Sequence, residues 1–245
     1  MLIIADAKML ELVAAFYLSK DKVGRQELSD GIDLHASNQA TFGLPTRLVA
    51  KTFAFRAIYC DETSGGAYGF SLDPDFADVS RSARWWQQRI DEFFTKYKGL
   101  ASWHGELLRS VGETGRLIMP YGREYSFFQE IKGGEKIWPK SKIYNYPVQG
   151  LGAELMAIVR VSLLKRIQKA QLTSLLVSTV HDSVLIDAPE KEVDKVCEIV
   201  YSVFRDVPRN FEKIFSIPFD MSLNVEIKTG PTWGNMELYN ADPSN

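Results

Sequence analysis

The sequence contains little that would cross-link the chain or anchor it in a membrane. It has two cysteines, Cys60 and Cys197, so one disulfide is the arithmetical maximum, and we expect both to be reduced thiols. No uncharged run approaches the ~20 residues of a membrane span. Asp6, Lys8 and Glu11 interrupt the apolar N-terminus, which also lacks the basic segment of a signal peptide. We therefore expect a cytoplasmic protein without a membrane partner.

An excess of basic residues is missing as well. Lys and Arg number 29 and Asp and Glu number 31 in 245 residues, which gives a formal net charge of −2. A basic footprint of the whole chain for nucleic acid is therefore excluded, although local basic patches are not. The 45% hydrophobic and 24% charged residues exclude a mostly disordered or collagen-like chain.

The hydrophobic patterns divide the chain into a helical first half and a mixed second half. An apolar strand at residues 1–5 ends at Asp6, and helical spacing then dominates up to Val111. The second half is predicted to contain, in order, a hairpin at 116–127, a long helix at 149–171, strands at 175–180 and 184–188, a helix at 190–207 and a last strand at 221–228. Helices packed on an antiparallel sheet form an α+β fold.

Two aspartates stand where predicted strands end. Asp6 closes the first strand, and Asp182 follows His181 between two later strands. Taken singly, they suit a helix N-cap and a turn Asp beside a solvated His. Taken together, the two carboxylates are hard oxygen ligands of the kind that Mg²⁺ prefers. Two Mg²⁺ ions bound side by side can stabilise the attacking and leaving oxygens of phosphoryl transfer.

One predicted helix carries four residues at a spacing of four, namely Arg47, Lys51, Phe55 and Tyr59. Each step turns about 400°, so the four side chains drift by only ~40° per step and share one face. A guanidinium and an ammonium suit a triphosphate, and a ring one turn further can stack on a sugar or base. The alternative is a solvated basic end and an aromatic end in the core, which the helix alone favours.

Six segments in one order resemble the palm and fingers of family A DNA polymerases, the group of bacterial DNA polymerase I and many phage replicases. They are ADAKMLELVAAFYLSKD from residue 5, DLHASNQATFG from 33, RLVAKTFAFRAIY from 47, GRLIMPYGREY from 115, NYPVQGLGAELM from 145 and TVHDSVLID from 179. The resemblance implies an antiparallel palm sheet backed by helices, with an inserted helical fingers subdomain. It assigns residues 1–19 and 116–245 to the palm and 20–115 to the fingers.

The resemblance implies a two-metal catalytic site. Asp6 and Asp182 would hold two Mg²⁺ ions, with the main-chain carbonyl of Ala7 as a further ligand, and Mn²⁺ could replace Mg²⁺. Arg47 and Lys51 would complete the catalytic set, with Lys51 as the general acid that protonates the pyrophosphate leaving group.

The resemblance also implies a pocket for an incoming deoxynucleoside triphosphate. Arg47, Lys51 and His35 would grip the triphosphate. Phe55 would lie against the ribose, and Glu11 would exclude a 2′-hydroxyl.

A further group would face primer–template DNA. Tyr59 would border the nascent base pair and the template. Asn145, Gln149 and His181 would face the duplex, with the latter two reading minor-groove acceptors common to all correct pairs. Ser183 departs from the family, which usually has Glu after the catalytic Asp.

Family members carry a thumb and usually a 3′–5′ exonuclease domain before the first motif. The sequence begins five residues before Asp6, so we expect a separate or removed part to supply them, with a protein partner as one source. The ending KTGPTWGNMELY is more phage-like than bacterial, which would place the protein in the host-cell cytoplasm.

The leading interpretation is thus the catalytic portion of a template-directed DNA polymerase. A non-catalytic nucleic-acid-binding or assembly subunit derived from a polymerase is the alternative, although such a relic has no need of Asp6, Lys51 and Asp182. A two-metal nuclease ranks last, because it does not explain the helix from Arg47 to Tyr59.

Overall fold

The computed structural model describes residues 1–59, 66–79 and 81–240. The chain forms two compact units, one made of Met1–Leu10 and Gly150–Asn245 and the other of Glu11–Gln149. We call them the sheet unit and the helical unit. Cys60 lies outside the described residues, and Cys197 is a buried free thiol. This division into compact units does not test the palm and fingers boundaries expected at 19/20 and 115/116, which stay a prediction.

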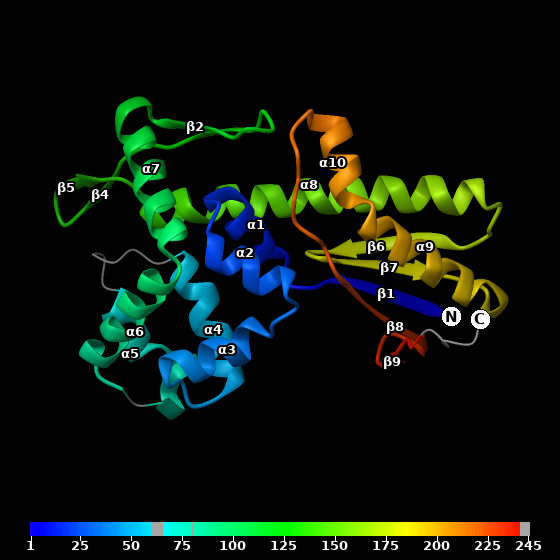
Figure 1. Cartoon of the computed structure of the whole chain (residues 1–245), viewed down its shortest axis with the longest axis horizontal. Helices are drawn as coiled ribbons and strands as arrows, with labels where there is room; N and C mark the ends of the chain where they lie inside the picture. The colour runs from blue at the N-terminus through cyan, green and yellow to red at the C-terminus, as the bar shows by residue number, and fades with distance from the viewer. Residues whose placement is uncertain (60–65, 80, 241–245) are drawn as a thin grey trace. The chain divides into compact units, whose positions relative to one another are not determined.

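The sheet unit is built on five antiparallel strands in the order β6-β7-β1-β8-β9 (Figure 1). Their bounds are β1 (Leu2–Ala7), β6 (Leu175–Val180), β7 (Ser183–Asp187), β8 (Val225–Thr232) and β9 (Asn235–Leu238). The first strand of the chain is the central strand and pairs with β7 and β8, which come more than 170 residues later. The antiparallel sheet and its helices confirm the α+β class.

Strand β1 has two unequal faces. Ile3, Ala5 and Ala7 are buried, whereas Asp6 is half-buried on the opposite face. Helix α9 (Val193–Arg205) packs against β1 and β8. Because successive side chains of a strand point to opposite faces, the alternation places Asp6 on the less buried face.

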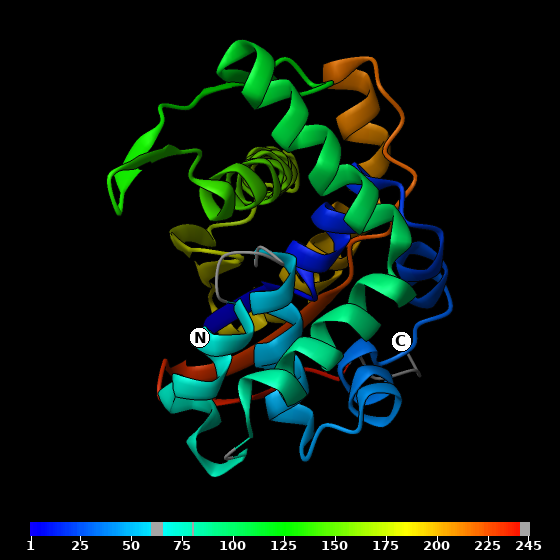
Figure 2. The same ribbon diagram turned by 90° about the vertical axis from the view of Figure 1, so that its left-hand side faces the viewer.

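Three further elements complete the sheet unit, namely η2 (Glu190–Glu192), α10 (Val207–Phe215) and the second half of α8 (Lys140–Lys169). Helix α8 is one continuous helix, seen from the side in Figure 1 and nearly end-on in Figure 2. Arg166 joins it to the end of α9, donating to Ser202 Oγ (2.7 Å) and Asp206 Oδ2 (2.6 Å). Among the described helices, only α8 is long and apolar enough to cross a membrane, and 56% of its most apolar 18-residue window is buried, as in a core helix.

A buried carboxylate fixes the entry into β6. Glu192 accepts hydrogen bonds from the amides of Thr173 (2.9 Å) and Ser174 (3.0 Å) and from both hydroxyls (2.8 and 2.7 Å). A carboxylate that is buried needs such partners, because its desolvation would otherwise be costly. The bonds join η2 to the loop before β6.

The helical unit contains seven α-helices and two hairpins among the described residues. Their bounds are α1 (Leu10–Ser19), α2 (Lys22–Ser29), α3 (Leu34–Phe42), α4 (Arg47–Ile58), α5 (Gly66–Leu72), η1 (Pro74–Val79), α6 (Ala83–Lys96), α7 (Lys98–Thr114), β2 (Arg116–Ile118), β3 (Glu124–Ser126), β4 (Glu130–Lys132) and β5 (Glu135–Ile137). Helix α8 starts in this unit.

Aromatic rings fill the core of the helical unit. Phe53 on α4 stacks on Trp86 of α6 (6.0 Å between ring centroids) and meets Phe93 edge-on (5.8 Å). All three side chains are fully buried. Aromatic pairs in these geometries contribute about 0.5–1.5 kcal/mol beyond the area that they bury. They fix α4 against α6.

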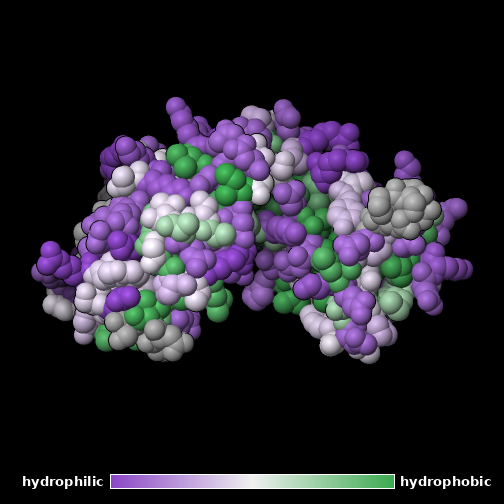
Figure 3. All heavy atoms as spheres, turned by 60° about the horizontal axis from the view of Figure 1, so that its bottom comes forward, coloured by the Kyte–Doolittle hydropathy of each residue, from purple (hydrophilic) through white to green (hydrophobic). Residues whose placement is uncertain are grey.

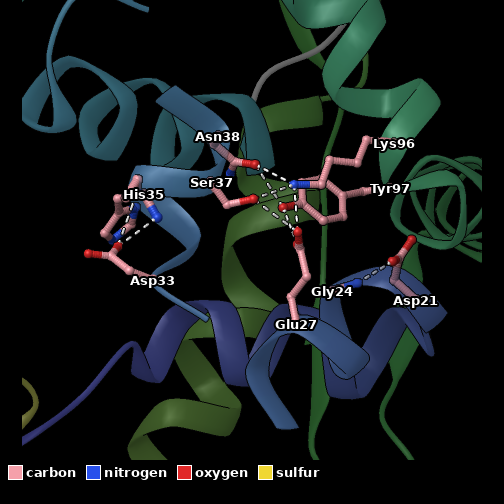
Figure 4. A network of polar contacts seen from close by, with 10 residues as sticks. Asp21, Gly24, Glu27, Asp33, His35, Ser37, Asn38, Lys96 and Tyr97 are labelled. Atoms are coloured by element: carbon pink, nitrogen blue, oxygen red, sulfur yellow. Dashed lines mark hydrogen bonds and ion pairs between the residues drawn. The ribbon is translucent and has the colours of Figure 1, made fainter. Parts of the chain in front are cut away.

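A polar network lies beside this core (Figure 4). Lys96 Nζ forms an ion pair with Glu27 (2.8 Å) and donates to Asn38 Oδ1 (2.9 Å). The Tyr97 hydroxyl lies 2.9 Å from both Glu27 Oε2 and Asn38 Oδ1. The network links α2, α3 and the end of α6. On the outside, hydrophilic residues dominate the face drawn in Figure 3, and hydrophobic ones form small separate patches.

Several predicted elements are confirmed, including the one that carries the cation and aromatic stripe. Thr46 Oγ1 accepts a hydrogen bond from the Val49 amide (3.1 Å) and caps α4, which begins at Arg47, the first residue of the predicted stripe. Gly43 ends α3 with a φ of 60°, in the left-handed region that favours glycine.

Three predicted boundaries are wrong. Helix α8 begins at Lys140 and contains Pro147, because the earlier turns are stabilised by buried Ile143 and by Tyr144, whose ring stacks on His104 at 3.9 Å. The helix predicted at 190–207 is shorter, because α9 covers Val193–Arg205, and a new helix, α10, begins at Val207 with Pro208 in its first turn, where the missing N–H is harmless. The last predicted strand begins at Val225, opposite the last residue of β1.

The Glu192 contacts predict a pH-dependent stability. Hydrogen bonds from Ser174 and Thr173 lower the pKa of Glu192 from 4.5 to about 2. The charged form therefore adds stability that is complete above pH 4.5 and is lost as the pH falls toward 2. We expect Glu192→Gln to lower the thermal midpoint by several degrees at pH 7, and this difference to shrink below pH 4.5. Circular dichroism melts measure it, with the exposed Glu190→Gln as control. An equal difference at pH 7 and pH 2.5 would contradict the assignment.

Candidate active site

The two predicted metal-binding aspartates come together in the sheet unit. Strand β1 pairs with β7 so that Asp6 lies opposite Ser183. The Ala7 amide donates to the Asp182 carbonyl oxygen (2.9 Å), which extends the pairing by one residue. Asp182 is thus the last residue of the turn before β7, and both aspartates are half-buried. The two aspartates therefore lie at the same end of the sheet, Asp6 in β1 and Asp182 in the turn before β7.

The turn that carries Asp182 has an unusual backbone. His181 is exposed and has a φ of 52°, in the left-handed region. This conformation is uncommon for a residue other than glycine, although His tolerates it better than most. A strained residue of this kind costs about 1–3 kcal/mol and is found most often at functional sites.

A third carboxylate, missed in the sequence, lies beside Asp6. Strand β8 pairs with the other edge of β1, and Glu226 lies opposite Asp6. Cross-strand neighbours share a face of the sheet, so Ser183, Asp6 and Glu226 form one row. Glu226 forms ion pairs with Lys8 (3.7 Å) and Lys228 (3.4 Å). The alternating pattern predicted this strand, but only the register shows what faces Asp6.

The donor set limits which metal the sheet unit could hold. Among the described residues, no group of three or more His, Cys, Asp or Glu side chains could hold a metal ion. A structural zinc cage needs about four such ligands and does not fit. Mg²⁺ fits, because it is commonly bound by one or two carboxylates plus water and substrate phosphate.

Predicted nucleotide-binding residues gather around the first turns of α4 in the helical unit. The Lys51 ammonium lies 6.0 Å from the centre of the Phe55 ring, and the His35 ring lies 5.7 Å from the same ring. Among the described residues, Lys51 has no ion-pair partner. Arg47 begins the helix one turn before Lys51 and forms an ion pair with Asp33, which the sequence did not lead us to expect.

His35 is held in its neutral form. Its side chain is only 4% exposed, and its Nδ1 atom has no hydrogen-bond partner within the described part of the chain. Burial, with repulsion from Arg47, lowers the pKa of His35 to about 4. A buried polar atom without a partner is costly unless a ligand satisfies it. A polar group of a ligand could supply the hydrogen bond that this atom lacks.

Three further predicted residues form a second cluster in the helical unit. Gln149 Nε2 donates to the Glu11 carboxylate and to the Tyr59 hydroxyl, 3.2 Å away. Burial, with the Glu11 charge, raises the pKa of Tyr59 well above its ordinary value. Asn145 is half-buried on α8, four residues before Gln149. The cluster orients Glu11 and Tyr59 through one amide.

The predicted site residues thus fall into two groups, one in the sheet unit and one in the helical unit. Asp6, Ala7, His181 and Asp182 belong to the sheet unit, whereas the residues predicted to contact the nucleotide belong to the helical unit. Sequence reasoning missed Glu226 and Asp33. A signal for Asp33 existed, because it is the N-cap of the segment that contains His35, but its partner Arg47 is 14 residues away.

Comparison with known proteins identifies the family. The sequence profile of DNA polymerase family A matches residues 1–235. The chain is 26% identical to DNA polymerase I of Chloroflexus aurantiacus over 242 residues, which cover 95% of the chain and 24% of that protein. It is 24% identical to the thermostable DNA polymerase I of Thermus aquaticus, covering 95% of the chain and 27% of that protein. The chain therefore spans about a quarter of the length of these relatives.

A solved structure has the same fold. The POL domain of Pol1 from M. smegmatis, in complex with DNA primer-template and dNTP, matches with a TM-score of 0.76 at 19% identity. The match covers 95% of the chain and 40% of that domain's chain. At this identity the match supports the fold, and the fold agrees with the family profile.

The environment of His35 predicts its titration. We expect its imidazole to titrate near pH 4 in the free chain, because burial and Arg47 both disfavour the charged form. Arg47→Ala should raise this pKa, and inorganic tripolyphosphate should raise it further by stabilising the imidazolium. NMR of the imidazole protons measures it, since the chain has three histidines and His35→Gln identifies the signal. The exposed Arg84→Ala is the control, and a pKa near 6.5 in the parent would contradict the assignment.

Proposed function

The chain belongs to DNA polymerase family A, and on that premise we propose that it is the catalytic portion of a template-directed DNA polymerase. The observation that carries the proposal is the pairing of β1 with β7, which brings Asp6 and the turn that carries Asp182 to the same end of the sheet. Asp6 stands on the less buried face of β1, and Asp182 stands in the turn before β7. They are the ligands that a phosphoryl-transfer site requires.

The proposed reaction adds one deoxynucleotide to a primer. The 3′-oxygen of the primer forms a bond with the α-phosphorus, and the bond from that phosphorus to the bridging oxygen breaks. Pyrophosphate leaves, and the hydroxyl proton passes to solvent. Lys51 supplies a proton to the pyrophosphate, for which its exposed ammonium is suited. Positioning and neutralisation of charge account for most catalysis of this kind.

Mg²⁺ is the metal that we propose for the sheet unit, with Mn²⁺ as a substitute. Asp6 and Asp182 would bind two ions, and the Ala7 carbonyl would add a ligand. When bound, the ions neutralise charge on the reacting phosphate and lower the pKa of the attacking hydroxyl. Because two carboxylates leave most of each coordination shell to water and phosphate, we expect weak metal binding without nucleotide.

The triphosphate is the ligand that we propose for the first turns of α4. Arg47 and Lys51 supply two positive charges one turn apart, and Lys51 has no ion-pair partner among the described residues. The Nδ1 atom of His35 is buried without a hydrogen-bond partner there and can contact a phosphate oxygen. The Phe55 ring lies near both His35 (5.7 Å) and the Lys51 ammonium (6.0 Å), and it could pack against the ribose.

The Glu11 cluster suits selection of the sugar and the base pair. Gln149 holds the Glu11 carboxylate, so this carboxylate has a defined position from which it can exclude a 2′-hydroxyl. Tyr59, which accepts a hydrogen bond from the same Gln149 amide, would border the nascent base pair. Asn145, Gln149 and His181 would contact the duplex. Amide and imidazole groups suit the degenerate acceptors of the minor groove.

Primer–template DNA and deoxynucleoside triphosphates are the proposed substrates. The M. smegmatis domain with the same fold was solved with both. This chain corresponds to 40% of that chain and to about a quarter of the curated relatives, so we propose that further polypeptide, on the same or another chain, contributes to DNA binding.

The metal role of Asp182 predicts the effect of its removal. We expect the 245-residue chain to extend a primed DNA template with Mg²⁺, and Asp182→Ala to lower the rate by about 10³-fold or more, because the loss of one metal ligand removes several kcal/mol of transition-state stabilisation. A gel assay with labelled primer measures it.

The matched control is Asp187→Asn, which removes an exposed carboxylate from the same strand. Equal extension by the parent and Asp182→Ala would refute the metal role. DNA binding without extension by the parent would favour the alternative, a nucleic-acid-binding or assembly subunit.

The position of Glu11 predicts its effect on sugar selection. Glu11→Ala opens the space of the carboxylate, so we expect the preference for deoxyribonucleotides over ribonucleotides to fall by about tenfold or more, ~1.4 kcal/mol. Glu11→Gln keeps the volume and should keep most of the preference. Competition assays with dATP and ATP measure the ratio. A preference unchanged in Glu11→Ala would show that Glu11 does not contact the sugar.

A further inference from the structure

Asp33 forms a forked ion pair with the guanidinium of Arg47 in this structure. Arg47 Nε donates to Asp33 Oδ2 (2.7 Å), and Arg47 Nη2 donates to Asp33 Oδ1 (3.2 Å). This forked geometry uses the same donors that a phosphate would take, because a carboxylate and a phosphate present similar oxygen pairs. A ligand phosphate that binds Arg47 in this way must first displace Asp33.

The carboxylate of Asp33 is the fixed member of the pair. It is the N-cap of α3, and its Oδ1 accepts from the amides of His35 (3.0 Å) and Ala36 (3.2 Å) (Figure 4). Moving the carboxylate would uncap the helix that carries His35. Arg47 has a longer and freer side chain, so the guanidinium is the group that moves.

The pair lies in water. The Arg47 and Asp33 side chains are 54% and 43% exposed. Exposed ion pairs contribute little net free energy, because solvent screens the charges and both side chains lose freedom. A polyphosphate can therefore displace Asp33, but every ligand that takes Arg47 incurs this small loss. The hydrogen bond from Arg47 also lowers the pKa of Asp33, which favours the charged carboxylate further.

We propose that Asp33 is an internal competitor for the phosphates at Arg47, and that its charge lowers the affinity for both the incoming triphosphate and the departing pyrophosphate. This inference rests on the proposed function, because it assigns the phosphate ligand to α4. Lys51, which is exposed, remains available to a first phosphate while Arg47 is still paired. Re-formation of the Asp33 pair then favours release of the product.

The test uses inorganic tripolyphosphate and the 245-residue chain, with Kd from an NMR chemical-shift titration at low salt. Asp33→Asn removes the charge and keeps an oxygen for the cap, since Asn caps helices about as well as Asp. We expect Asp33→Asn to bind tripolyphosphate about 2- to 5-fold more tightly, which corresponds to about 0.4–1 kcal/mol. The affinity of Asp33→Asn for pyrophosphate should rise by a similar factor.

Asp30→Asn is the matched control. It makes the same charge change three residues earlier, and the Asp30 carboxylate accepts from Gln26. Its Kd should stay close to that of the parent. A double-mutant cycle gives the second control, because Asp33→Asn should have no effect once Arg47→Ala has removed the partner.

Each outcome decides a separate point. Weaker binding by Asp33→Asn would mean that Asp33 orients Arg47 for the ligand, and unchanged binding would mean that it only caps α3. Both results would overturn the proposal. An equal gain in tripolyphosphate affinity in Asp30→Asn, or from Asp33→Asn in the Arg47→Ala background, would overturn it too. If Arg47→Ala and Lys51→Ala bound tripolyphosphate as well as the parent, the triphosphate site of the proposed function would fail instead.

Discussion

The position of β1 between β7 and β8 is the constraint on which the chemistry of the sheet unit depends. This strand begins the chain, yet its partners lie more than 170 residues later, so its register is set entirely by the folded sheet. Apolar residues alternate along it, with Ile3, Ala5 and Ala7 buried. A slip by one residue would turn these side chains to the other face and would move Asp6 with them. The buried face therefore determines the register, and the register determines what Asp6 faces.

A different principle acts in the helical unit, where some cations are matched by nearby carboxylates. Arg56 pairs with Asp73 and Asp75, and Lys96 pairs with Glu27 in a network next to the aromatic core. Lys51 lacks such a partner among the described residues. A net charge of −2 therefore conceals a local contrast, in which one face of α4 keeps a cation that the protein does not neutralise. Local charge of this kind, rather than the total, decides whether an anion binds.

Local signals in the sequence predicted more of this fold than of its site. Thr46 and Gly43 mark helix ends by their own chemistry, so α3 and α4 could be predicted within a few residues. The start of α8 could not, because the stacking of Tyr144 on His104 joins residues 40 apart. The residues of the site were found through a resemblance to a family, but their partners depend on tertiary contacts. A spacing of four on a helix predicts a shared face, and it says nothing of a carboxylate on another helix.

The number of carboxylates near Asp6 does not by itself say which of them could bind a metal. The row of Ser183, Asp6 and Glu226 is an example. The resemblance to family A polymerases places Ser183 where the family usually has Glu, which raises the question of whether Glu226 replaces it. The sheet argues against this, because Glu226 lies on the other side of β1 from Ser183 and its carboxylate is already paired with Lys8 and Lys228. A carboxylate balanced by two ammonium groups is a weaker metal ligand than one without them, since a cation must displace or oppose those charges. Glu226 is therefore left out of the metal site that we propose, although it lies beside Asp6 on the sheet.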